Sequence, residues 1–155
     1  MPETQAKHYT ESIYYDIELT ARVMKVLGVQ SFEKMGLGIT PEEHAALDTI
    51  SCHPTICQRD LAKLILKDRA NTGRILNSLE EKKLITRFVD VKNNRLIKKM
   101  TITEEGFKRL HETNSKLKVI LQQISSIFPQ EEIDNLQNTL RNFRKKLEEF
   151  VDMNI

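Results

Sequence analysis

Two groups of hydrogen-bonding and basic side chains stand out in this 155-residue chain. The first group is Arg69, Asn71, Thr72 and Arg74. Arginine can donate two parallel hydrogen bonds to guanine, asparagine can pair in a similar way with adenine, and threonine offers a hydroxyl or a methyl group. The second group, between two alternating apolar stretches, is Lys92, Asn93, Asn94 and Arg95. Arginine at such a turn suits the narrow minor groove of DNA, whose negative potential attracts it. Both groups predict contacts with double-stranded DNA.

The segments around these residues are expected to hold them in place. Residues 58–65 and 68–83 have the apolar spacing of two short helices joined by a tight turn, and Asp68 suits the cap of the second. Residues 85–90 and 96–102 resemble the two strands of a hairpin. Two such helices place the second one in a DNA major groove, and a β-ribbon beside them reaches a neighbouring groove. This order predicts a winged helix-turn-helix.

Further helices are expected on both sides of this core. Apolar residues recur at helical spacing from Thr10 to Leu27, and Thr40 with Pro41 opens the next helix as its cap and first residue. Two more apolar series follow between residues 103 and 150. The break after the first helix is expected at Gly28, Gly36 and Gly38.

The fold class is therefore expected to be mainly α with a small β-wing (α+β), a winged helix-turn-helix core flanked by long dimerisation helices. We expect one domain over residues 1–155, made of an N-terminal dimerisation helix in 1–38, a DNA-binding lobe in 40–106 and C-terminal dimerisation helices in 103–155. The outer apolar faces are longer than one winged helix can cover, so a second copy is the expected partner. A homodimer also matches two DNA half-sites about 34 Å apart. The alternative is a bundle within one chain.

Charge is unevenly distributed along the sequence. Residues 53–110 carry 14 Lys or Arg against 7 Asp or Glu, whereas the rest of the chain carries 10 against 15. A basic segment of this kind is the electrostatic footprint expected for a polyanion partner. No apolar run approaches the ~20 residues that cross a bilayer, and the first residues lack a signal-peptide pattern. No membrane contact and a cytoplasmic location are therefore expected.

The central segment contains, in this order, Asp60-Leu61-Ala62, residues 68–69, 74–85 and 90–95, and residues 102–106. In these residues it resembles the MarR family of bacterial and archaeal transcriptional regulators. The resemblance implies a homodimer that represses or activates a small set of promoters, with repression favoured, and that leaves its operator when it senses a signal. The chain departs from the family's pattern at Asn71 and Gly73, where Ser, Thr or Val is common, and at Val91, where Pro is usual.

Cys52 and Cys57 flank the turn at His53-Pro54. Cys57 occupies the cap of the first core helix, where the family usually has Ser or Thr, and a thiol at a helix N-terminus is more reactive. The pair is therefore a candidate redox switch. The alternative is that cysteine serves there as a small, usually buried residue.

A pocket for a small aromatic effector is a further expectation. Its candidate lining is Tyr14, Tyr15, Met24, Met35 and His44, and the alternative for each residue is ordinary core packing. Glu43, His44 and the distant His111 offer too few ligands for zinc, which needs about four. We therefore expect no metal and no cofactor.

Catalysis is not expected of this chain. It has no Ser-His-Asp or Cys-His pattern at a recognisable spacing, and only five glycines, none in a phosphate-binding loop. The alternative to a DNA-binding regulator is a helical module that uses its winged helix to bind protein without DNA. Arg95 and the basic middle of the chain favour DNA over that alternative.

Overall fold

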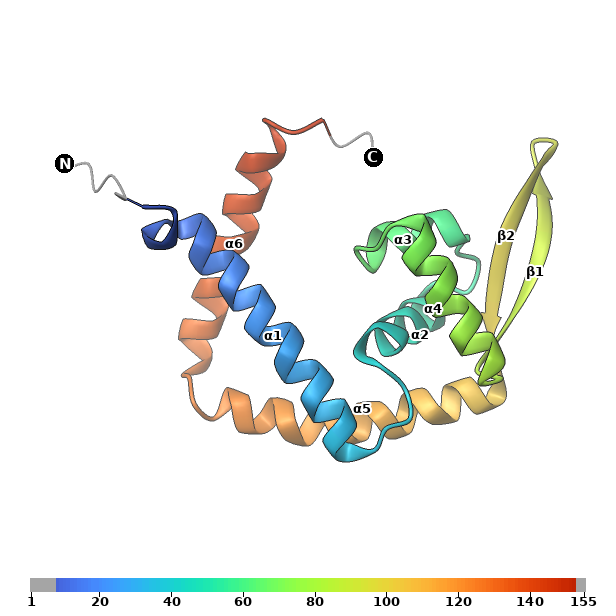
Figure 1. Cartoon of the computed structure of the whole chain (residues 1–155), viewed down its shortest axis with the longest axis horizontal. Helices are drawn as coiled ribbons and strands as arrows, with labels where there is room; N and C mark the ends of the chain where they lie inside the picture. Colours follow the sequence, from blue (N-terminus) through green and yellow to red (C-terminus); the bar gives the residue numbers. More distant parts are fainter. Residues whose placement is uncertain (1–7, 153–155) are drawn as a thin grey trace. The chain divides into compact units, whose positions relative to one another are not determined.

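The computed structural model describes residues 8–152 as helices joined by short loops and one β-hairpin (Figure 1). The mainly helical fold with a small wing is confirmed. In chain order the elements are a 3-10 turn (Tyr9–Glu11), α1 (Ile13–Met35), α2 (Pro41–Cys52), α3 (Gln58–Leu64), α4 (Arg69–Glu81), β1 (Ile85–Lys92), β2 (Arg95–Ile102), α5 (Glu104–Ser125) and α6 (Gln130–Glu148). Packing groups the described residues into two compact units, and the boundary between them falls inside α5, after Thr113.

Helix α1 continues past Gly28, where the sequence predicts a break. A single glycine inside a helix costs only about 1 kcal/mol relative to alanine, so it does not by itself end one. The helix ends instead at Gly36, which adopts the left-handed conformation (φ 61°) and whose N–H donates to the carbonyls of Glu33 and Phe32. A side chain is unfavourable in that conformation, and glycine is therefore the usual residue at such an end.

The starts of α2 and α4 follow the sequence expectation. The Thr40 hydroxyl accepts a hydrogen bond from the Glu43 N–H at 3.1 Å, and Pro41 is the first residue of α2. At α4 the Asp68 carboxylate accepts from the Asn71 N–H at 2.7 Å. Each cap satisfies a backbone N–H that a helix leaves without an internal partner, so both helix starts are confirmed.

The core lies between α2, α3, α4 and the base of the hairpin. Helix α2 packs against α3, α4 and β2, while α4 also contacts α3 and β1. A stripe along α4, formed by Thr72, Ile75, Leu76 and Leu79, is buried because these positions share one face of the helix. The largest apolar side chains with almost no exposed surface are Leu47, Ile50, Leu61, Leu76, Leu79, Leu84, Ile85 and Met100.

The tight turn between α3 and α4 sets the direction of α4. Leu66 lies in the left-handed region (φ 60°). The N–H of Lys67 donates to the carbonyl of Ala62 at 3.0 Å, which closes the end of α3. Helix α4 then begins two residues later at Arg69.

The hairpin is longer at its tip than the sequence indicates. Strands β1 and β2 are antiparallel and in register from Ile85 opposite Ile102 to Lys92 opposite Arg95. Only Asn93 and Asn94 form the turn, and both have positive φ (51° and 59°). Asparagine tolerates this conformation better than most residues, and positive φ at both turn positions matches the twist of a two-residue hairpin. Lys92 and Arg95 are therefore the last strand pair rather than part of a loose loop.

The beginning of α5 is fixed against the base of the hairpin. The Thr103 hydroxyl donates to the carbonyl of Lys83 at 2.7 Å and accepts from the N–H of Gly106 at 3.0 Å. A Cβ on Gly106 would lie 2.1 Å from the carbonyl oxygen of Leu84, so no larger residue fits without moving the backbone. This close approach holds the first turn of α5 against Leu84, the residue between α4 and β1.

Candidate nucleic-acid interface

The first two turns of α4 carry the polar group that the sequence singles out. Arg69 and Arg74 are exposed, and Asn71 is half-buried. The Asn71 side-chain N–H donates to the Asp68 carboxylate at 3.0 Å, and its amide oxygen accepts from Arg74 Nη2 at 2.7 Å. The chain Asp68–Asn71–Arg74 therefore orders the arginine on the surface of the helix. An ordered donor loses less freedom when it binds a base edge.

Thr72 does not join this surface. Its side chain has no exposed area, and its hydroxyl donates to the carbonyl of Asp68 at 2.8 Å. The expectation that Thr72 contacts DNA directly is wrong, because it shares the buried helical stripe with Ile75 and Leu76. Its role is to pack the start of α4 against the core.

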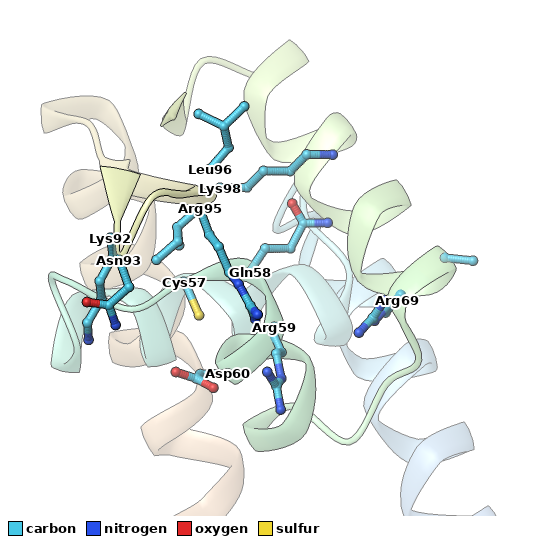
Figure 2. Close-up of a pocket in the computed structure, with 12 residues that line it drawn as sticks. Cys57, Gln58, Arg59, Asp60, Arg69, Lys92, Asn93, Arg95, Leu96 and Lys98 are labelled. Carbon is cyan, nitrogen blue, oxygen red and sulfur yellow. The ribbon is translucent and has the colours of Figure 1, made fainter. Parts of the chain in front are cut away.

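A groove runs between the N-terminus of α3, the first turn of α4 and the outer half of the hairpin (Figure 2). Its volume is about 1020 Å³, and Asp60 is the one acidic residue in its lining. Among the described residues, none of the five basic side chains that line it forms a salt bridge. These side chains are Arg59, Arg69, Lys92, Arg95 and Lys98. Such a groove attracts phosphate, because cations without carboxylate partners remain available to a polyanion.

Other cations of the lobe are held by acidic partners. Arg87 on β1 donates two hydrogen bonds to Glu80 at the end of α4, at 3.0 and 3.3 Å, and Lys99 pairs with Asp90 across the hairpin at 3.0 Å. The hydrogen bond from Arg87 holds the pKa of Glu80 below its ordinary value, and the bond from Lys99 does the same for the pKa of Asp90. These pairs brace the hairpin, whereas Lys98 faces the groove.

Two glutamates in the first turn of α2 hold α4 from both ends. Glu43 is buried, accepts a hydrogen bond from Ser78 at 3.2 Å and pairs with Lys82 at 2.7 Å. Glu42 pairs with Lys67, just before α4, at 2.7 Å. The hydrogen bond from Lys67 lowers the pKa of Glu42. Lys67 therefore braces the helix in the free chain.

Both cysteines carry free thiols. Cys52 is exposed, while Cys57 is half-buried and lines the groove. The Cys57 side chain makes no capping hydrogen bond at α3, but its backbone forms a β-bridge with Lys99. The start of α3 is thereby attached to the edge of β2.

The five residues expected to line an effector pocket are not brought together within the described chain. Tyr14 and Met24 are exposed, whereas Tyr15, Met35 and His44 are half-buried. The His44 ring packs edge-on against Phe32, with the ring centres 5.8 Å apart. None of the five lines the groove, nor a second cavity of about 290 Å³ at the junction of α1 and α2. The main apolar lining of that second cavity is Val29, Phe32, Leu37, Ile39 and Pro41.

Two further features bear on the kind of site. Within residues 8–152, no group of three or more His, Cys, Asp or Glu residues is placed to hold a metal ion. None of the described helices has the length and apolar character needed to span a membrane.

Part of the groove lining is not evident from the sequence. Gln58 and Arg59 at the start of α3 both face the groove, and the strand pattern alone does not distinguish Lys98 from Lys99. The spacing of residues in α3 does not indicate that Gln58 and Arg59 face the groove. It follows from the β-bridge between Cys57 and Lys99, which joins segments 42 positions apart in the chain.

The fold and this groove define a winged helix-turn-helix protein. The family model of MarR matches residues 39–97, from the residue before the α2 cap into β2. The helix-turn-helix and most of the wing therefore match the MarR family, which confirms the resemblance.

Solved structures support the same assignment. The chain is similar to Staphylococcus aureus MepR in a complex with DNA, with 25% identity, a TM-score of 0.72, and coverage of 90% of this chain and 99% of that one. A probable transcriptional regulator from Pseudomonas aeruginosa has 20% identity and a TM-score of 0.74 over 88% and 99% of the two chains. Ligand-free MarR from E. coli has 17% identity and a TM-score of 0.68 over 85% and 96%. No curated protein matches the chain.

Proposed function

We propose that this chain is a sequence-specific DNA-binding repressor that acts in the cytoplasm as a homodimer and leaves its operator on a small-molecule or redox signal. The observation that carries the proposal is the groove with five basic side chains that lack carboxylate partners among the described residues. The likeness to MepR in a DNA complex supports it.

The proposed contacts divide between the two grooves of DNA. Arg74 and Asn71 would read base edges in the major groove from the first turns of α4. Arg95, beside the Asn93-Asn94 turn, would enter the minor groove, where negative potential favours arginine. Arg69 and Lys92 line the same groove as Arg95 and would contact phosphates.

The proposed dimer is supported by apolar side chains that lie exposed on the outer helices. Helix α1 exposes Ile13, Val23 and Met24, all more than half exposed. Helix α6 exposes Leu136 and Leu140 and has no buried residue. Leu136 and Leu140 are four positions apart, the spacing of an apolar face that packs against another helix. A second copy with the same faces is the partner that two-fold symmetry supplies.

The experiment that tests DNA binding is a salt series with three variants. Binding of the wild type to its preferred site should weaken steeply as salt rises, because phosphate contacts release counterions. Arg74→Ala should weaken binding to the preferred site by about 1–3 kcal/mol and binding to random DNA much less. Arg95→Ala should weaken both and reduce the salt slope by about one for each phosphate neutralised by Arg95, doubled in a dimer. Arg144→Ala, an exposed arginine on α6, is the matched control.

If the wild type shows no DNA binding that weakens as salt rises, the alternative of a module that binds protein without DNA is favoured instead. The proposed function fails if Arg74→Ala and Arg95→Ala both retain wild-type affinity and salt slope.

A redox signal would act through Cys57. Oxidation of this thiol would place a larger polar group in the groove that DNA must occupy. Mild peroxide should weaken DNA binding, a thiol reductant should restore it, and Cys57→Ser should bind normally and resist peroxide. Cys52→Ser is the control, because Cys52 does not line the groove. Unchanged binding after verified oxidation of Cys57 would exclude this signal and leave a small aromatic effector as the releasing agent.

A further inference from the structure

We propose that Gln58, the first residue of α3, reads a base edge through a gap that Gly73 leaves in the recognition helix α4. This inference rests on the proposed function and names a specificity-determining residue outside α4. The expected base is adenine, because a glutamine side chain can accept from the adenine amino group and donate to adenine N7 at the same time.

Gly73 is not required by the fold of the free chain. It lies between buried Thr72 and exposed Arg74 in the second turn of α4, and its φ is not positive. A Cβ at this position would meet only Gln58 Nε2, at 3.7 Å, which is ordinary van der Waals contact. Glycine inside a helix is otherwise unfavourable relative to alanine. The absence of a side chain therefore has a use on the surface rather than in the core.

Gln58 is the residue that borders this gap. Its side chain lines the groove together with Arg69 of α4 and with Arg95 and Lys98 of the wing (Figure 2). In the described part of the chain its amide makes no hydrogen bond, so its donors and acceptor remain available. Since Gln58 is half-buried, its position is also restricted by its neighbours.

Several side chains around Gln58 are basic, and a neutral amide among them can contribute base specificity that they do not. Arg59, Arg69 and Lys98 attract phosphate of any sequence. An uncharged amide adds nothing to counterion release but can distinguish bases by its donor and acceptor pattern. Gln58 and Gly73 would thus act as a pair: the glycine opens the space, and the glutamine from the neighbouring helix uses it.

The first test compares binding of Gln58→Ala to the wild type's preferred site and to scrambled DNA. We expect affinity for the preferred site to fall roughly 5- to 150-fold. Binding to scrambled DNA, the salt slope and the melting temperature should stay unchanged. Site selection from random DNA should show relaxed preference at one position in each half-site.

Two further variants separate base reading from simple packing. Gln58→Glu has the same shape but cannot donate, so preference at that position should move from adenine towards cytosine, whose amino group a carboxylate accepts from. Gly73→Val should push Gln58 aside and weaken binding as much as Gln58→Ala does. The double variant Gln58→Ala with Gly73→Val should bind no more weakly than either single one, because coupled residues are not additive.

The outcomes distinguish this inference from the proposed function. If the wild type shows no salt-dependent DNA binding, the proposed function itself fails. If the wild type selects a site and both Gln58→Ala and Gln58→Glu retain its base preferences, the inference alone is overturned. An equal decrease in affinity for preferred and scrambled DNA with a changed salt slope would also overturn it, since that result describes binding to phosphate.

Discussion

Helices α4 and α6 are both amphipathic, but only the apolar face of α4 is buried within the chain. Helix α4 has 13 residues and buries four of them against α2, α3 and the hairpin. Helix α6 has 19 residues, an apolar series that includes Leu136, Leu140 and Leu147, and no buried residue. The comparison shows that apolar spacing defines a helical face without defining what covers it. The covered face of α4 belongs to the core, and the uncovered face of α6 is the one assigned to the proposed dimer.

The largest effect is expected from charges on the uncovered face. Leu140→Glu combined with Phe143→Glu should abolish the dimer and reduce folding, because two carboxylates would be buried at the interface. Sedimentation at micromolar concentration measures the change from dimer to monomer. Asn142→Glu, an exposed position between them, is the control and should remain dimeric. A wild type that sediments as a monomer would remove the basis for this comparison.

The second largest effect is expected from truncating a buried side chain on the covered face of α4. Leu79→Ala should lower the free energy of unfolding by about 2–5 kcal/mol, since Leu79 is fully buried and the cavity fills only partly. Leu136→Ala makes the same chemical change on α6, where the side chain is 61% exposed within the chain. Its cost should depend on protein concentration, because it would act through association. Urea denaturation at two protein concentrations distinguishes the two behaviours, and a concentration-dependent cost for Leu79→Ala would argue against the comparison.

The polar contacts that orient α4 should have a smaller effect. Glu43→Ala should cost about 1–3 kcal/mol of stability, because it leaves Ser78 and Lys82 without their partner beneath the helix. Glu43→Gln, which keeps an acceptor, should recover part of that stability. Glu81→Ala is the control, since Glu81 is exposed at the end of the same helix. Thermal denaturation and the ratio of specific to random DNA binding measure the effect. Equal results for Glu43→Ala and Glu81→Ala would contradict a role in positioning α4.

The smallest effect is expected from pH. Hydrogen bonds from Lys67, Arg87 and Lys99 lower the pKa of Glu42, Glu80 and Asp90 respectively, below ordinary values of 4.5, 4.5 and 3.8. A lowered pKa in the folded chain adds stability above the ordinary value, and this contribution is lost as pH falls through the lowered pKa.

The melting temperature should therefore fall modestly below about pH 4.5, because all three carboxylates are solvent-accessible and their ion pairs are screened. Melting curves between pH 6 and 3 measure this decline. Asp90→Asn should be less stable than the wild type at pH 6 and should lose less stability on acidification. A melting temperature that rises on acidification would contradict the direction of these pKa shifts.

Local signals in the sequence predict the elements of the lobe well. Thr40 and Asp68 cap their helices as expected, because capping depends on residues only three positions apart. The differences arise where packing overrides a local signal. Gly28 does not break α1, and Thr72 lies in the core although Asn71 and Arg74 near it in the sequence are polar. Whether a helical residue is buried depends on which side of the helix packs against the core. That side is known only when the packing partners of the helix are known.

Only part of the candidate interface can be predicted from the sequence, because some of its residues are placed by contacts between distant elements. Arg69 and Arg95 can be identified because each lies in an element with a recognisable local pattern. Gln58 and Arg59 cannot, because their place in the groove depends on the contact between α3 and the edge of β2.

The sequence by itself determined the order of helices and strands, the caps of α2 and α4, the place of the hairpin tip and the basic middle of the chain. These features depend on backbone preferences and on charges that are local in sequence. Only the tertiary structure decided which cations are paired and which are available. Lys67, Lys82 and Lys99 have carboxylate partners across the fold, whereas Arg69 and Arg95 line an open groove. Ion pairing depends on distances of a few ångströms between elements, and those distances exist only once the core between α2, α3, α4 and the hairpin has formed.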